Sequence, residues 1–154
     1  GDLGDPRHFC RVRGNRAGRP RLSIHLDEAV RVMIVLFVAL AGSLGAVARF
    51  IVDGLIRTKL VGPFPWGTFL VNVSGSLLLG VLTGLVMFHA APSTLTTVMG
   101  VGFCGGYTTF STTNFETARL VAERHFASAW ISPVATMICT VAAAWVGLAI
   151  TSAI

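Results

Sequence analysis

The stretch that decides the fold is Gly102-Phe103-Cys104-Gly105-Gly106-Tyr107-Thr108-Thr109-Phe110-Ser111-Thr112, because glycine and hydroxyl residues interrupt an otherwise apolar segment there. Glycine costs about 1 kcal/mol per helix-interior site relative to alanine, and threonine adds a smaller penalty. Inside a bilayer, irregular backbone is tolerated only where it is buried in protein or lines an aqueous cavity. The stretch therefore predicts a break in a membrane helix and a candidate functional site. The alternative is a continuous glycine-rich helix packed closely against its neighbours.

The rest of the chain is strongly apolar. Of its 154 residues, 53% are hydrophobic and 12% are charged, whereas soluble domains are roughly 25% charged. A hydrocarbon core about 30 Å thick needs about 20 apolar residues of helix. Four segments meet this requirement: residues 33–52, 66–88, 93–121 and 126–154. The sequence thus predicts an all-α, multi-pass protein of the cell membrane with four transmembrane helices, the third of them broken.

The first 32 residues have a different composition. They hold seven of the twelve Lys and Arg residues and four of the seven acids, without an apolar period. Such a segment cannot bury enough surface to fold alone, so we expect a disordered extension over residues 1–32 and a four-helix transmembrane domain over residues 33–154. Met33 opens the first apolar run, and one hypothesis makes it the natural start. The other is a genuine basic tail that rests on anionic lipid.

Lys and Arg asymmetry normally sets the orientation of a membrane protein, but it is weak here. One side of the predicted bundle carries Arg57, Lys59, Arg119 and Arg124, and the other carries only the N-terminal extension. If the extension counts, the two sides nearly cancel. This balance permits insertion in both orientations.

No acidic residue lies in the middle of a predicted span, since Asp53, Glu116 and Glu123 all fall toward helix ends. A proton-coupled exporter of cations needs a membrane-embedded carboxylate, so this class is disfavoured. No nucleotide motif or catalytic constellation indicates an enzyme. Amide and hydroxyl groups, backbone dipoles and aromatic edges are the polar groups available, and they suit an anion or a neutral solute.

The second predicted helix carries a stripe of small and polar residues. Asn72, Ser76, Gly80 and Gly84 recur at four-residue intervals and therefore share one face. Small residues at this spacing let helices approach closely. The amide of Asn72 either lines a pore or joins two helices by hydrogen bonds.

Arg49 ends a similar small-residue face on the first helix. Even low estimates put a charge at mid-bilayer at about 2.5–3.5 kcal/mol, so Arg49 must pair, extend to the interface or serve an anion vestibule. Asp53, one turn later, is its expected local partner. An anchor near the helix end and a vestibule residue are both compatible with the sequence.

The stretch over residues 102–112 resembles the third-helix signature of the Fluc (CrcB-type) fluoride channels. Two further stretches agree with the family in order and spacing: GSLGAVARF at residues 42–50, and GTFLVNVSGS at residues 67–76 followed by Gly80. Together these stretches make residues 33–154 similar to the family, and only the extension is left out.

The resemblance implies an antiparallel, dual-topology dimer with two fluoride pores, embedded in lipid. It also implies a structural sodium ion at the dimer interface, held by the backbone carbonyls of Gly105 and Thr108. Asn72 would donate to fluoride and Phe110 would present its ring edge. The remaining pore positions would be Ser111, Thr112, Thr113 and Thr136.

One position departs from the family pattern. A second phenylalanine usually follows the first by three residues, and this chain has Thr113 there. Phe115 would project from another face and cannot substitute. We therefore expect either a homodimer or, because the aromatic pair is incomplete, a heterodimer with a related subunit. The implied function is passive export of fluoride; the alternatives are a small dual-topology multidrug exporter and a membrane scaffold that transports nothing.

Overall fold

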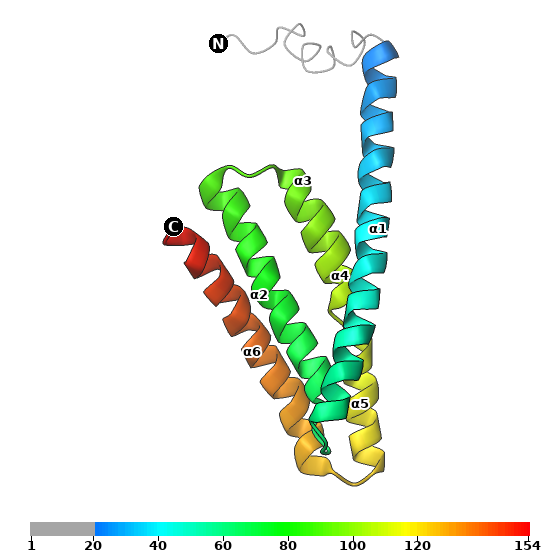
Figure 1. Cartoon of the computed structure of the whole chain (residues 1–154), viewed down its shortest axis with the longest axis vertical. Helices are drawn as coiled ribbons and strands as arrows, with labels where there is room; N and C mark the ends of the chain where they lie inside the picture. Colours follow the sequence, from blue (N-terminus) through cyan, green and yellow to red (C-terminus); the bar gives the residue numbers. More distant parts are fainter. Residues whose placement is uncertain (1–20) are drawn as a thin grey trace, which may run out of the picture. The chain divides into compact units, whose positions relative to one another are not determined.

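The computed structural model describes residues 21–154, with side chains from residue 25 onward. Helices account for nearly all of this part, and no strand occurs in it (Figure 1). The elements, in chain order, are α1 (Arg21–Lys59), α2 (Trp66–His89), α3 (Ser93–Leu95), the π-helix η2 (Thr96–Cys104), α4 (Gly105–Tyr107), α5 (Ser111–Ala122) and α6 (Phe126–Ser152).

The chain divides into two compact units, Gly1–Met33 and Ile34–Ile154, and the break and the cavities described below lie in the second. Helix α1 begins at Arg21, so residues 21–32 are helical and the disorder expected for them is not found. The physical reason is that a helix nucleated in the apolar run extends at little cost through residues with fair helix propensity. Residues 1–20 of the predicted extension lie outside the described residues.

In the part of the chain that the structure describes, three helices are long and apolar enough to cross a membrane: His25–Lys59 within α1, Trp66–His89, and Phe126–Ser152. The remaining expected span, residues 93–121 and third in chain order, is present as two helical parts. The first comprises α3, η2 and α4, and the second is α5. The predicted break is confirmed, because helical structure stops after Tyr107 and resumes at Ser111.

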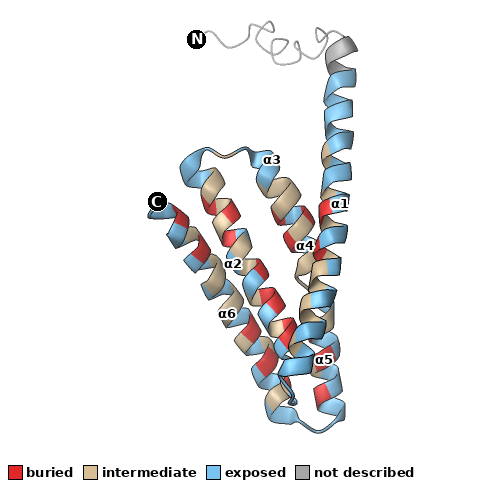
Figure 2. Ribbon diagram, in the orientation of Figure 1, coloured by how far each residue is buried: buried red, intermediate tan, exposed pale blue. Residues whose placement is uncertain are grey.

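Large apolar side chains cover the outside of this unit. Leu44 and Phe50 of α1 are 66% and 82% exposed, and Trp130 and Trp145 of α6 are 76% and 69% exposed. Buried positions instead face neighbouring helices, as the red segments of α2 and α6 illustrate (Figure 2). So much exposed apolar surface is unfavourable in water and is what a lipid-facing protein requires.

Helices α2 and α6 lie side by side and touch through small residues (Figure 1). A Cβ atom added to Gly80 would lie 2.9 Å from the carbonyl carbon of Ala144, and one added to Gly147 would lie 2.8 Å from the backbone nitrogen of Val81. Larger residues would separate the helices. The glycine spacing predicted from α2 thus serves close packing of the kind common between membrane helices.

Helix α1 approaches the third segment in the same way. A Cβ atom on Gly106 would lie 2.8 Å from the carbonyl carbon of Gly42, and one on Gly102 would lie 2.9 Å from the carbonyl oxygen of Val38. Backbone therefore packs directly on backbone along the part of the chain that leads to the break.

We predict that Gly106→Ala lowers the free energy of unfolding by about 2 kcal/mol, the usual scale for overpacking a tight contact. Unfolding in mixed detergent micelles measures this. The matched control is Gly54→Ala, because a Cβ atom at Gly54 of α1 meets nothing within 4 Å. That variant should be neutral or slightly stabilising, since alanine is the better helix former. Equal losses in both variants would contradict the packing argument.

Candidate functional site

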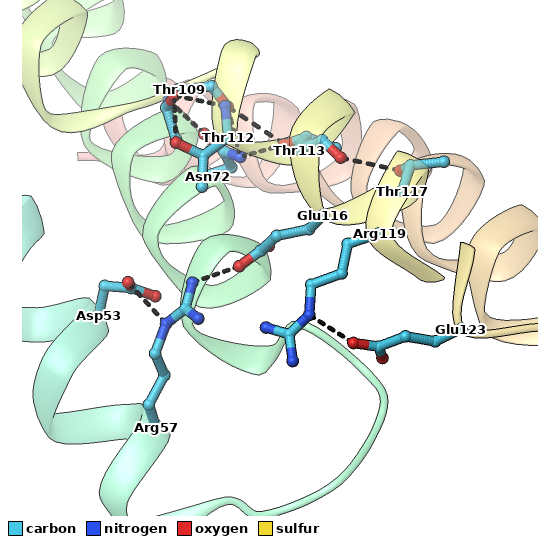
Figure 3. A network of polar contacts seen from close by, with 10 residues as sticks. All are labelled: Asp53, Arg57, Asn72, Thr109, Thr112, Thr113, Glu116, Thr117, Arg119 and Glu123. Atoms are coloured by element: carbon cyan, nitrogen blue, oxygen red, sulfur yellow. Dashed lines mark hydrogen bonds and ion pairs between the residues drawn. The ribbon is translucent and has the colours of Figure 1, made fainter. Parts of the chain in front are cut away.

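The break in the third segment is held by Asn72 of α2. Its side-chain Nδ2 donates to the carbonyl oxygen of Thr109 at 3.0 Å, and the backbone N–H of Thr109 donates to Asn72 Oδ1 at 2.8 Å (Figure 3). Asn72 is only 7% exposed. One buried amide therefore satisfies both backbone groups of the central residue of the break, which membrane interiors otherwise leave unpaired.

Hydroxyl groups complete the turn into α5. The backbone N–H of Thr112 donates to Thr109 Oγ1 at 3.3 Å, and Thr113 Oγ1 donates to the carbonyl oxygen of Thr109 at 3.2 Å. These bonds satisfy groups that a helix start leaves free. Thr113 Oγ1 also accepts from Asn72 Nδ2 at 3.4 Å. The threonines that disfavoured a continuous helix are thus the groups that stabilise the break.

This arrangement changes the surroundings of two carbonyl groups. In a continuous helix the N–H of Thr109 would donate to the carbonyl of Gly105, and that of Thr112 to the carbonyl of Thr108. Both N–H groups are directed elsewhere, to Asn72 Oδ1 and to Thr109 Oγ1. The carbonyls of Gly105 and Thr108 therefore lose their helical donors. These are the two carbonyls to which the family resemblance assigns an ion.

The first half of the segment is fixed against α2. Tyr107 places its hydroxyl 3.1 Å from Ser74 Oγ and stacks its ring on Phe103 with centroids 5.8 Å apart. Thr108 donates from Oγ1 to the carbonyl oxygen of Cys104 at 2.8 Å. Gly75 lets this end of the half-helix come close, because a Cβ atom there would lie 3.1 Å from the Tyr107 ring.

A groove of about 660 Å³ runs beside the break. It brings together six of the nine predicted site residues: Asn72, Gly105, Thr108, Phe110, Thr113 and Thr136. Phe110 is 79% exposed, so its ring is available along the groove. The hydroxyl of Thr136, from α6, donates its hydrogen to the carbonyl oxygen of Ser132 at 2.7 Å. The Thr136 oxygen can therefore act only as an acceptor toward the groove.

Two other predicted residues line a second cavity of about 220 Å³. Arg49 and Thr112 meet there with Asp53, Thr68 and Thr109. Ser111 is exposed and lines neither cavity; its hydroxyl lies 3.3 Å from Thr109 Oγ1. The site residues predicted from sequence are thus divided between a groove and a cavity beside it.

Thr68 was not among the predicted residues, although its side-chain oxygen is buried without a hydrogen-bond partner and the residue is 3% exposed. It lies four residues before Asn72 and so on the same face of α2. This spacing is the signal by which the sequence could have indicated it.

The expected partnership of Arg49 with Asp53 is wrong. Asp53 Oδ2 instead accepts from Arg57 Nε at 2.8 Å, and the other end of the Arg57 guanidinium pairs with Glu116 of α5. In the described part of the chain, Arg49 has no ion pair. Arg49 and Arg57 lie one turn before and one turn after Asp53, so either could pair with it. Arg57 pairs because it can also reach Glu116 on α5.

The family described as CrcB-like protein, Camphor Resistance (CrcB), matches residues 36–148. This range contains all the residues that line the groove. The chain belongs to the CrcB family. The family membership expected from the sequence is therefore confirmed, and the three helices able to span a membrane make this CrcB-family protein a multi-pass protein of the cell membrane.

Individual relatives cover most of the CrcB-family chain. It is 44% identical over 116 residues to the "Fluoride-specific ion channel FluC 1" of Leifsonia xyli subsp. xyli, and this alignment covers 75% of this chain and 85% of the relative. It is 52% identical over 88 residues to the "Fluoride-specific ion channel FluC 2" of Cutibacterium acnes, covering 56% and 72%. Against "Fluoride-specific ion channel FluC 2" of Mycobacterium bovis the identity is 42% over 121 residues, covering 79% and 93%.

We predict that Asn72→Ala loosens the break in this CrcB-family chain. It leaves the N–H of Thr109 unpaired, at a cost of about 1–3 kcal/mol for a buried group, and the carbonyl of Thr109 keeps only the bond from Thr113 Oγ1. Hydrogen exchange should accelerate at the amides of residues 109–113. Asn114→Ala is the control, because Asn114 also lines the groove but is exposed and makes no side-chain hydrogen bond to the break. Unchanged exchange in Asn72→Ala would contradict the bracing role.

Proposed function

We propose that this chain is a subunit of a fluoride-selective ion channel, which lets cytoplasmic fluoride leave passively down its gradient and so relieves fluoride toxicity. The observation that carries the proposal is the groove in which Asn72, Phe110, Thr113 and Thr136 meet in a chain of this family. Relatives at 42–52% identity carry the name of fluoride-specific ion channels. Neither a multidrug exporter nor a scaffold is favoured by these relatives.

The chemistry of the groove suits a small anion that must bind weakly enough to leave. The positive edge of an aromatic ring attracts an anion without holding it as a full cation would. Phe110 offers such an edge, and amide and hydroxyl groups lie around it. Asn72 Nδ2 would donate to fluoride by giving up its long bond to Thr113 while keeping its bond to the carbonyl of Thr109.

We further propose that the third segment crosses the membrane as two halves, which makes four crossings, with the break near the middle. Two subunits in opposite orientations would then pack with their breaks together. The high exposure of Phe110, and the open space beside Gly105, support a surface that a second subunit completes. The exposed apolar faces of α1 and α6 would contact lipid.

Thr113 bears on the identity of the second subunit. It replaces an aromatic ring with a hydroxyl that is bonded to the break itself. We propose that a related subunit supplies the missing ring, so that the working channel is a heterodimer. Robust fluoride efflux from liposomes that hold the purified chain alone would contradict this and favour a homodimer.

The break also fits a structural sodium ion. The carbonyls of Gly105 and Thr108, which lose their helical donors, would hold it together with their counterparts in the second subunit. Hard cations prefer oxygen ligands, and backbone carbonyls without helical donors supply them. When bound, the ion would neutralise the converging carbonyl dipoles at the crossing point.

Deleting the gene from its host should raise cytoplasmic fluoride in cells exposed to it, and returning the wild-type gene should restore the lower level. Phe110→Ala should fail to restore it, because the ring edge in the groove is lost. Phe115→Ala is the control, since Phe115 is also exposed but does not line the groove. A fluoride electrode on washed, lysed cells measures the effect. Equal concentrations of cytoplasmic fluoride in cells with and without the gene would contradict the proposal.

The sodium proposal predicts a higher thermal unfolding temperature in sodium chloride than in N-methylglucamine chloride at the same ionic strength. Binding to the folded state alone stabilises it by about 2.7 kcal/mol at a hundredfold excess over Kd, which corresponds to several degrees. Differential scanning fluorimetry of the detergent-purified assembly checks this. Identical unfolding curves in the two salts would contradict sodium binding by these carbonyls.

A further inference from the structure

Arg57 joins two helices through two carboxylates. Its Nε donates to Asp53 Oδ2 at 2.8 Å within α1, and its Nη2 donates to Glu116 Oε1 on α5 (Figure 3). The side chain of Arg57 is 49% exposed, whereas that of Glu116 is 9% exposed. The arginine therefore reaches from the end of α1 to a carboxylate that is almost out of contact with solvent.

Glu116 depends on this one partner. Its second oxygen, Oε2, is buried and makes no hydrogen bond. Removing one member of a buried ion pair leaves the other as an uncompensated charge, which is more serious than losing an exposed pair. Asp53 also has a buried oxygen without a hydrogen bond, Oδ1, but 25% of its side chain is exposed, against 9% for Glu116. The loss of Arg57 would thus be felt chiefly at Glu116.

The position of Glu116 connects it to the groove. Thr113, which lines the groove, and Glu116 are three residues apart and both are 7% exposed, so they share the buried face of α5. Glu116 also lines a separate cavity of about 260 Å³ at the end of the bundle, beside the loop between α1 and α2. Thr113 and Glu116 therefore lie one helical turn apart, the first beside the groove and the second beside the end cavity.

The charges around this end cavity balance only when Arg57 is present. Its lining includes two cations, Arg57 and Arg119, and two anions, Glu116 and Glu123. Arg119 and Glu123 form their own exposed pair, with Arg119 Nε 2.7 Å from Glu123 Oε1. Water screens that pair. It does not screen Glu116 to the same degree.

We propose that Arg57 controls the charge at one end of the anion pathway: by pairing with the buried Glu116 it cancels a negative charge at the end cavity and keeps that end passable to anions. The inference rests on the proposed function. The expected loss of efflux comes from the charge of Glu116 and not from a weaker contact between α1 and α5. An uncancelled carboxylate repels an anion over several ångströms in a poorly solvated site.

The test returns variants to host cells that lack the gene and measures fluoride efflux per copy in the membrane, with copies counted by immunoblot. Arg57→Gln should reduce efflux by about tenfold. The double variant Arg57→Gln with Glu116→Gln should recover most of the loss, since the repelling charge is gone. Glu116→Gln alone should stay within about twofold of wild type, because Arg57 keeps its pairing with Asp53.

Arg119→Gln is the matched control. It removes a cation from the same cavity, but from a screened pair, and should change efflux by less than about twofold. Arg57→Lys keeps the charge and loses the forked geometry, and it should keep at least about a third of wild-type efflux even if Arg57→Gln does not accumulate.

Two results would overturn the inference alone, provided that wild type restores efflux. The first is that the double variant is as impaired in efflux as Arg57→Gln. The second is that Arg57→Lys reaches the membrane but loses efflux to the extent expected for Arg57→Gln. Wild type that restores nothing would instead overturn the proposed function.

Discussion

The two-way hydrogen bond between the Asn72 amide and the backbone of Thr109 is the interaction on which the rest of the site depends. A membrane interior offers no water to a broken helix, so the break at residues 108–110 can exist only if another group satisfies its backbone. Asn72 does this from a neighbouring helix, at 2.8 and 3.0 Å. The hydroxyls of Thr109 and Thr113 then complete the turn into α5. Without this set of bonds the two halves would have no fixed relation.

The same bonds give the break its chemical character. Because Thr109 donates to Asn72 and Thr112 donates to Thr109 Oγ1, the carbonyls of Gly105 and Thr108 are no longer used by the helix. Glycines make the geometry possible, since Gly42 and Gly106 bring α1 against the first half and Gly75 admits Tyr107 and Thr108. The amide and hydroxyl groups that line the groove are thus the groups that the broken backbone requires.

Much of this fold could be predicted from the sequence, because the informative signals are local. Twenty apolar residues in a row predict a span, and glycine and threonine crowded at 102–112 predict a break, whatever the neighbours are. Pairing between distant side chains is a different matter. Arg57 selects Glu116, 59 positions away, and this depends on how α1 and α5 approach each other. For the same reason Arg49 was assigned the wrong partner, and the helical residues 21–32 were expected to be disordered from their polar composition alone.

The sequence also left two roles open for Asn72, a pore donor and a link between helices; the geometry shows the link and leaves room for the proposed donor. Its bonds to Thr109 are those of a link, while the longer contact to Thr113, at 3.4 Å, is the one that an anion could replace. The account therefore predicts that anion movement and the integrity of the break fail together. Membrane vesicles from host cells, loaded with fluoride or chloride and given an outward gradient without ATP, test this most directly. Vesicles with the wild-type chain should release fluoride and retain chloride, and vesicles with Asn72→Ala should retain both. Fluoride release that is as fast without the chain as with it would contradict the account.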